Sequence, residues 1–131
     1  MIFFFIDDDT DDQEIFSMAM SEVDPSVTCK FANDGIEALA ELNDETFIPG
    51  CIFIDLNMPR MNGNECLIEI RKIDRLAKVP VFIYSTSANP QRIEENKQLG
   101  ATDFIVKPYG LGALTEILTR ILQNNKPYGG S

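Results

Sequence analysis

Short, nearly continuous apolar segments alternate along the chain with segments that carry apolar residues at helical spacing. The apolar segments predict β-strands at Ile2–Ile6, Val27–Phe31, Cys51–Ile54, Val81–Tyr84 and Phe104–Val106. Apolar residues that run on without polar alternation are typical of parallel strands covered by helices on both faces.

The segments between these strands carry helix start signals. In chain order they are Thr10 with Gln13, Asp34 with Glu37, Asn62 with Glu65, and Asn89 followed by Pro90. A fifth helix is expected to begin near Gly110. Strands and helices in strict alternation predict an α/β fold, a doubly wound parallel sheet flanked by helices. We expect one domain at residues 1–124 and a flexible tail at residues 125–131, which are polar and rich in glycine. The fourth helix has only Ile93 and Leu99 as large apolar residues, so we expect it to be weakly held.

The composition excludes several classes of function. A net charge of −10 argues against direct binding to nucleic acid. The longest apolar run, IFFFI, is far shorter than the roughly 20 residues of a membrane span. The chain has no histidine and no CxxC pair, which argues against zinc, haem and disulfide frameworks and against Ser-His or Cys-His nucleophiles. Three cysteines at irregular spacing suit the reducing cytoplasm.

Polar residues that can bind a ligand or react follow the predicted strands at their carboxyl ends. They are Asp7, Asp8 and Asp9 after the first strand, Asp55 after the third, Ser85 after the fourth and Lys107 after the fifth. Ligands of open parallel sheets bind beyond the carboxyl ends of the strands, so we expect these residues on one rim. Asp11 and Asp12, further along, fit acids that complement a helix dipole.

This set of residues suits phosphoryl transfer. Clustered carboxylates without soft ligands favour Mg²⁺, with Mn²⁺ as an alternative. Asp55 is then the nucleophile that accepts a phosphoryl group, Lys107 supplies a positive charge, and Ser85 donates to a phosphoryl oxygen. No histidine base is needed, because an ionised carboxylate has no proton to lose.

The acid cluster, the segment DLNMPRMNG, the hydroxyl after the fourth strand and the KP dipeptide occur in one order and spacing. Together they resemble the receiver domains of two-component response regulators, in particular single-domain chemotaxis regulators, over residues 1–124. The resemblance implies a flavodoxin-like five-stranded sheet of order 2-1-3-4-5 with five helices. It also implies a phosphorylation-dependent switch rather than an enzyme, although the domain assists its own phosphorylation and autodephosphorylation.

Carried over by position, the resemblance implies a role for each site residue. The phosphoacceptor is Asp55, and the metal ligands are Asp7, Asp8, Asp55 and the backbone carbonyl of Asn57. The phosphoryl-binding and switch residues are Ser85, Thr86, Lys107 and Phe104, and the residues that tune the site are Asp9, Asn57 and Ser87. The bond between Lys107 and Pro108 is expected to be cis.

The same resemblance implies partners. The phosphoryl donor is a sensor histidine kinase or a histidine phosphotransfer protein, and the output is contact with a separate downstream protein or a place in a phosphorelay. We expect that contact, or a homodimer, to use the fourth helix, the fifth strand and the fifth helix. We expect no direct contact with nucleic acid or with a membrane.

Two other interpretations start from the same acids. A Mg²⁺-dependent phosphatase of the haloacid dehalogenase type would use Asp7 as nucleophile and Asp9 as its partner, but Asp11 breaks the motif. A calcium-binding loop that starts at Asp7 would need glycine in place of Asp12 and glutamate in place of Met18. The phosphatase is retained as the alternative function.

Overall fold

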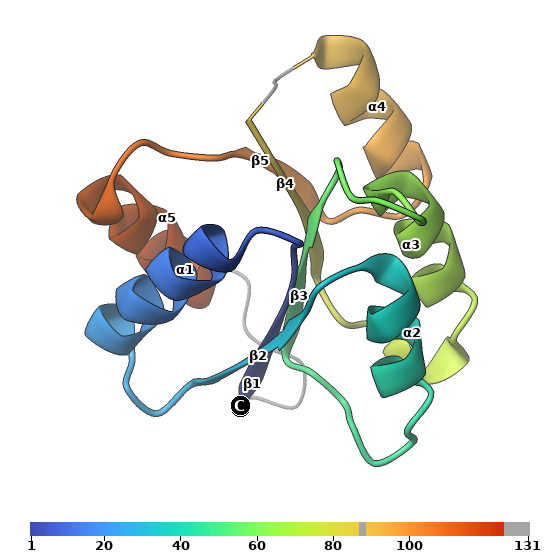
Figure 1. The fold of residues 1–131 in the computed structure, drawn as a ribbon, viewed down its shortest axis with the longest axis horizontal. Coiled ribbons are helices and arrows are strands. Elements are labelled where there is room, and N and C mark those ends of the chain that lie inside the picture. Colours follow the sequence, from blue (N-terminus) through green and yellow to red (C-terminus); the bar gives the residue numbers. More distant parts are fainter. Residues whose placement is uncertain (87–88, 125–131) are drawn as a thin grey trace.

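The apolar segment Ile2–Ile6 forms the strand β1 at the centre of a parallel sheet (Figure 1). The computed structural model describes residues 1–86 and 89–124. The other strands are β2 (Thr28–Ala32), β3 (Cys51–Asp55), β4 (Val81–Ser85) and β5 (Asp103–Val106). They lie in the order β2-β1-β3-β4-β5 and all pair in parallel, which confirms the expected fold class and strand order.

Helices cover both faces of this sheet. The α-helices are α1 (Thr10–Val23), α2 (Gly35–Leu42), α3 (Gly63–Arg71), α4 (Pro90–Gln98) and α5 (Leu111–Asn124), and a short 3₁₀ turn, η1, spans Asp74–Leu76. Helices α1 and α5 lie on one face, and α2, α3 and α4 lie on the other (Figure 1).

The two faces of β1 explain why its sequence is apolar throughout. Alternate residues of a strand point to opposite faces. Phe3 and Phe5 therefore join the core under α1 and α5, where the rings of Phe5 and Phe16 lie 4.3 Å apart. Phe4 and Ile6 join the second core under α2 and α3. A strand buried on both sides has no position left for a polar residue.

The strand boundaries differ by one residue from the sequence-based expectations. β2 runs from Thr28 to Ala32 rather than from Val27 to Phe31. β3 and β4 each continue one residue further than their apolar segments, so that Asp55 pairs with Tyr84 and Ser85 pairs with Val106. β5 begins one residue earlier, at Asp103. Pairing with neighbouring strands carries the ladder past the last apolar side chain, which puts Asp55 and Ser85 on rigid backbone.

Most of the expected helix starts are confirmed. Asn62 and Glu65 form a reciprocal capping box at the start of α3. Asp34 caps α2 by accepting from the Glu37 N–H, and Asn89 caps α4. The expected cap Thr10 is wrong and is corrected below.

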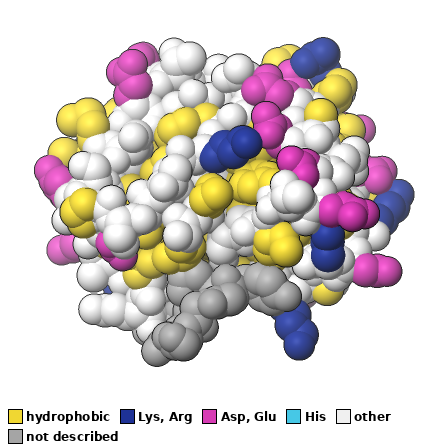
Figure 2. All heavy atoms as spheres, turned by 90° about the horizontal axis from the view of Figure 1, so that it is seen from below, with side chains coloured by type: hydrophobic (Ala, Val, Ile, Leu, Met, Phe, Trp, Pro, Cys, Tyr) yellow, Lys and Arg dark blue, Asp and Glu magenta, His cyan; other side chains and the backbone are white. Residues whose placement is uncertain are grey.

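Seen from below, the molecule exposes hydrophobic side chains in the middle of one face, and acidic and basic side chains lie mainly toward its edges (Figure 2). The acidic surplus of the chain is therefore not gathered into one patch on that face. Among the described residues, no helix is long and apolar enough to cross a bilayer.

The side chain of Arg71, at the end of α3, joins several turns. Its Nε donates to the Gly100 carbonyl over 2.9 Å, and its Nη1 donates to the carbonyls of Leu76 and Val79 over 3.1 and 3.0 Å. Gly100 has φ +109, and a Cβ there would lie 2.9 Å from Arg71 Cγ. The guanidinium thus ties the segment after α4 to the turn before β4.

Gly63, the first residue of α3, allows that helix to approach the end of β3. A Cβ at this position would lie 2.7 Å from the Asp55 carbonyl oxygen and 2.8 Å from Leu56 Cα. Both contacts are with backbone, which cannot rotate away. Any larger residue here would move the strand end that carries Asp55.

We expect Gly63→Ala to lower the free energy of unfolding by about 1–3 kcal/mol, the usual cost of overpacking a buried site. Gly112→Ala is the matched control, because a Cβ at Gly112 of α5 meets nothing within 4 Å. That control should raise stability by up to about 1 kcal/mol through helix propensity. Urea denaturation followed by circular dichroism measures both changes. If Gly63→Ala is as stable as the parent, close approach to the β3 backbone does not require glycine at this position.

Candidate functional site

The carboxyl ends of neighbouring strands bring four of the predicted residues to one edge of the sheet. Asp7 directly follows β1, and its N–H donates to the Ala32 carbonyl over 3.0 Å. Asp55 is the last residue of β3, and Ser85 is the last residue of β4. Lys107 follows β5, and its N–H donates to the Ser85 carbonyl over 2.8 Å.

Three carboxylates cluster at this edge. One carboxylate oxygen from each of Asp7, Asp8 and Asp55 lies within 4.8 Å of the others. Asp7 is 0% exposed and Asp55 is 6% exposed, whereas Asp8 is open to solvent. Carboxylates this close repel one another unless a cation compensates them. A donor set made only of oxygens fits a hard divalent cation such as Mg²⁺.

Lys107 supplies positive charge from the side of β5. Its Nζ lies 2.7 Å from Asp12 Oδ2, 3.2 Å from Asp7 Oδ2 and 3.6 Å from Asp55 Oδ2. It also lies 5.4 Å from the centre of the Tyr84 ring. Burial alone would lower the pKa of Lys107, but the hydrogen bond to Asp12 and the charges of Asp7 and Asp55 outweigh burial and raise it. The ammonium is therefore a permanent charge of the site.

Burial shifts the acids of the cluster toward their protonated forms. It raises the pKa of Asp7 to about 7, against the lowering effect of the hydrogen bond from the Asp9 N–H, and the charge of Asp55 adds to the increase. Burial likewise raises the pKa of Asp55, which the charge of Lys107 opposes. Folding therefore costs energy at this edge when no metal is bound.

The side chain of Asp9 caps α1 and does not join the carboxylate cluster. Its side chain accepts from the N–H groups of Asp11 and Asp12, which makes it the N-cap in place of the expected Thr10. Thr10 is already inside the helix. Gln13, the expected partner in a capping box, instead donates to the Asp7 carbonyl over 2.8 Å. A carboxylate is a strong acceptor for the free N–H groups of a first turn, and here it replaces the hydroxyl.

The remaining residues that the sequence singled out occupy different surroundings. Ser85 is buried, Thr86 is exposed, and the partly buried Phe104 packs against the core under α2 and α3. The N–H of Asn57 donates to Asp55 Oδ1 over 3.2 Å. Ser87 lies outside the residues that the structure describes.

The bond between Lys107 and Pro108 is trans, because the described residues contain no cis peptide bond. The expectation of a cis bond is therefore wrong for this structure. The trans form is the ordinary preference of such bonds, by roughly 0.5–1 kcal/mol.

Two further contacts escaped the sequence analysis. Asp12 was assigned to the helix dipole, yet it makes the shortest ion pair of Lys107. Arg60, in the loop after β3, has φ 67 and pairs with Asp34, the N-cap of α2. A left-handed backbone is unfavourable for a residue with a Cβ, so this ion pair helps to hold the loop that follows Asp55. The sequence carries no local signal for these contacts, because the paired charges are separated by whole helices and strands.

Comparison with known proteins finds several that are similar to this chain in sequence. Residues 3–119 match the family model of the response regulator receiver domain. The two-component response regulator ORR13 of Oryza sativa subsp. japonica is 34% identical over 116 residues, which are 88% of this chain and 93% of that protein. The sensor histidine kinase CheAY of Helicobacter pylori is 27% identical over 118 residues, and the match covers 90% of this chain but only 14% of that protein.

A solved structure agrees with these sequence matches. The phosphorylated cyanobacterial phytochrome response regulator RcpA superposes with a TM-score of 0.84 and 28% identity. The superposition covers 93% of this chain and 91% of that one. The strand order and the helices on each face are thus shared with a protein of known fold.

The raised pKa of Asp7 predicts that the metal-free protein loses stability as the pH rises from about 4 to about 7. In this range the unfolded carboxyl, with its ordinary value of 3.8, has lost its proton, whereas folded Asp7 keeps its proton up to about pH 7. The folded state thus binds more protons, and raising the pH favours unfolding. Melting temperatures in EDTA across this range measure the effect.

Asp7→Asn should flatten this pH profile, because the amide does not titrate. Asp11→Asn, which changes the same charge at an exposed position, should keep the slope of the parent. Equal slopes in the parent and in Asp7→Asn would show that the burial of Asp7 does not set the profile.

Proposed function

Since this chain belongs to the family of response regulator receiver domains, which signal by phosphorylation in two-component systems, we propose that Asp55 is its phosphoacceptor. One observation carries the proposal. Asp55 is a nearly buried carboxylate at the rigid end of a central strand, inside a cluster of acids and 3.6 Å from a lysine ammonium. A carboxylate held at this place, beside a cation and among potential metal ligands, is suited to act as a nucleophile.

The transfer needs no general base. A carboxylate oxygen of Asp55 attacks the phosphorus of a phosphohistidine, which a sensor histidine kinase or a phosphotransfer protein presents. The new P–O bond forms as the P–N bond breaks, and the electron pair leaves with the imidazole. Positioning and charge neutralisation supply the catalysis, since the transferring group is metaphosphate-like.

Each neighbouring residue has a proposed part in this transfer. Asp7, Asp8, Asp55 and the carbonyl of Asn57 would hold Mg²⁺, or Mn²⁺ in its place, and that ion would neutralise charge on the phosphoryl oxygens. Lys107 binds an oxygen of the group from the other side, and the hydroxyl of Ser85, with Thr86 beside it, donates to another. Asn57 and Ser87 tune the autodephosphorylation that the domain assists, and Asp9 tunes the acidic pair Asp7 and Asp8.

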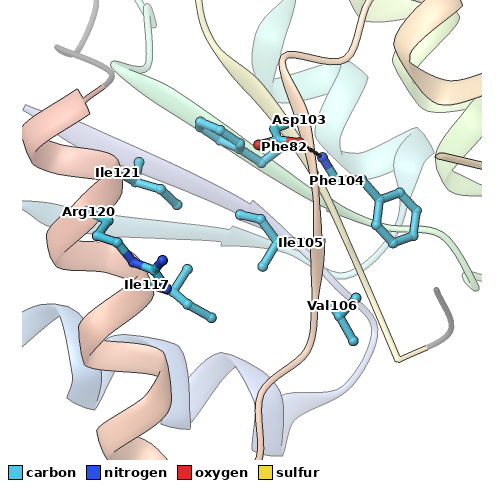
Figure 3. A pocket seen from close by; sticks show the side chains of 8 residues that line it. All are labelled: Phe82, Asp103, Phe104, Ile105, Val106, Ile117, Arg120 and Ile121. Atoms are coloured by element: carbon cyan, nitrogen blue, oxygen red, sulfur yellow. Dashed lines mark hydrogen bonds between the residues drawn. The ribbon is translucent and has the colours of Figure 1, made fainter. Parts of the chain in front are cut away.

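We further propose that the output face consists of α4, β5 and α5. Among its described side chains, α4 buries only Asn96, so little apolar contact holds it. A cavity of about 340 Å³ opens between β5 and α5, where Ile105 and Ile117 face each other (Figure 3). Val106 of β5 is 45% exposed. Apolar surface of this kind suits a downstream protein, or a second copy of the chain in a homodimer.

Mass spectrometry after treatment with acetyl phosphate and Mg²⁺ tests the phosphoacceptor. We expect one phosphoryl adduct on the intact protein, mapped to Asp55, and none on Asp55→Asn. Asp74→Asn is the matched control at an exposed aspartate and should be labelled like the parent. Asp8→Ala should need more Mg²⁺ for the same labelling.

An adduct on another residue would overturn the assignment of Asp55. Turnover of a small phosphate ester that survives Asp55→Asn but not Asp7→Asn would favour the alternative, a Mg²⁺-dependent phosphatase with its nucleophile after β1.

Asn96 offers a test of how weakly α4 is held. Its side chain is 0% exposed, and neither amide atom has a hydrogen-bond partner among residues that the structure describes. A buried amide without partners costs about 1–3 kcal/mol, so Asn96→Ala should raise the free energy of unfolding by a similar amount. Gln98→Ala, on the exposed side of α4, controls for helix propensity and should change stability by less than about 1 kcal/mol. Destabilisation by Asn96→Ala, measured by urea denaturation, would contradict this reading.

A further inference from the structure

The first turn of α1 adds the carboxylate of Asp12 to those of Asp7 and Asp55 beside Lys107. We propose that Asp12 competes with the phosphoryl group for the Lys107 ammonium, and thereby lowers the affinity of the site for a phosphoryl group. This inference rests on the proposed function of Asp55 and adds a positioning residue to it. Asp12 acts through Lys107 and touches neither the proposed nucleophile nor the metal ligands in any contact that the structure describes.

The distances rank the partners of the ammonium. Asp12 Oδ2 lies 2.7 Å from Lys107 Nζ, whereas Asp55 Oδ2 lies 3.6 Å away. Only the Asp12 distance is that of a strong charge-assisted hydrogen bond. Asp12 is also absent from the described group of carboxylates whose oxygens lie within 4.8 Å of one another. It therefore engages the lysine without belonging to the candidate metal site.

The surroundings keep this ion pair in place. The side chain of Lys107 is 13% exposed and that of Asp12 is 30% exposed, so the pair is less screened than one on the open surface. The backbone of Asp12 is held as well, because its N–H donates to the N-cap Asp9 over 3.4 Å. The carboxylate thus projects from a fixed turn of α1.

Phosphorylation would add a further negative group for the Lys107 ammonium to neutralise. A phosphoryl group adds negative charge to Asp55, and Lys107 is the cationic side chain that the structure pairs with Asp55. If the ammonium leaves Asp12 for a phosphoryl oxygen, it gives up its shortest contact. If it stays with Asp12, that carboxylate remains close to the new negative charge and repels it. Either way, Asp12 makes the phosphorylated form less favourable.

Beryllium trifluoride with Mg²⁺, a mimic of an aspartyl phosphate, measures the affinity of the site by isothermal titration calorimetry. We expect Asp12→Asn to bind this probe about threefold to tenfold more tightly than the parent, as the loss of one partly buried charge implies. Asp11→Asn makes the same change of charge on the same turn at an exposed position, and it should stay within about twofold of the parent. Asp12→Glu keeps the charge and should return the affinity toward that of the parent.

A second measurement needs no ligand. A double-mutant cycle of Asp12→Asn and Lys107→Met in EDTA should show coupling of about threefold or more in the unfolding equilibrium constant. A value near one would mean that the two side chains are not energetically paired, and would overturn the proposal.

The outcomes separate this inference from the proposed function. If Asp12→Asn and Asp11→Asn tighten binding equally, net charge explains the effect and the inference fails. Weaker binding in Asp12→Asn would mean that Asp12 aims the lysine at the phosphoryl group, which also overturns it. If the parent neither binds the probe nor gains an adduct on Asp55, the proposed function itself fails.

Discussion

Charge balance at the carboxyl edge of the sheet is the constraint on which this site depends. Asp7 and Asp55 are carboxylates withdrawn from water, and burial of an ion is costly unless an opposite charge lies beside it. The fold provides one such charge, the ammonium of Lys107, and shares it among three acids. The edge therefore keeps an excess of negative charge, which a divalent cation is suited to offset.

The scaffold around this edge is firm on one side and loose on the other. Phenylalanine rings from β1, β3 and α1 pack under the cluster, and the ends of β3 and β4 lie within the hydrogen-bonded ladder. By contrast, α4 is the next described helix after β4, and it buries a single described side chain, an amide without partners. A charge change at Asp55 would thus meet rigid backbone at the ends of β3 and β4, whereas the helix that follows β4 is weakly held.

The sequence was sufficient for the features that repeat along the chain. Apolar segments and their spacing predicted the sheet and its helices, and strand ends predicted the gathering of Asp7, Asp55 and Lys107, because parallel strands finish at one edge. Which of several side chains makes a given hydrogen bond or ion pair was not predictable in the same way. Asp9 and Thr10 both suit an N-cap, and only the path of the backbone selects Asp9. Asp12 and Lys107 are far apart in sequence, so no local pattern links them.

The contacts of Arg71 give α4 two unequal ends. At its C-terminal side, the Gly100 carbonyl is bound by a guanidinium that also grips the turn before β4. At its start, the cap that the described residues provide is Asn89, a contact within the helix itself. A helix held at one end rotates about that end rather than moving along its axis. A rearrangement near Ser85 would therefore displace the start of α4 most, and the end of α4 next to Gly100 least.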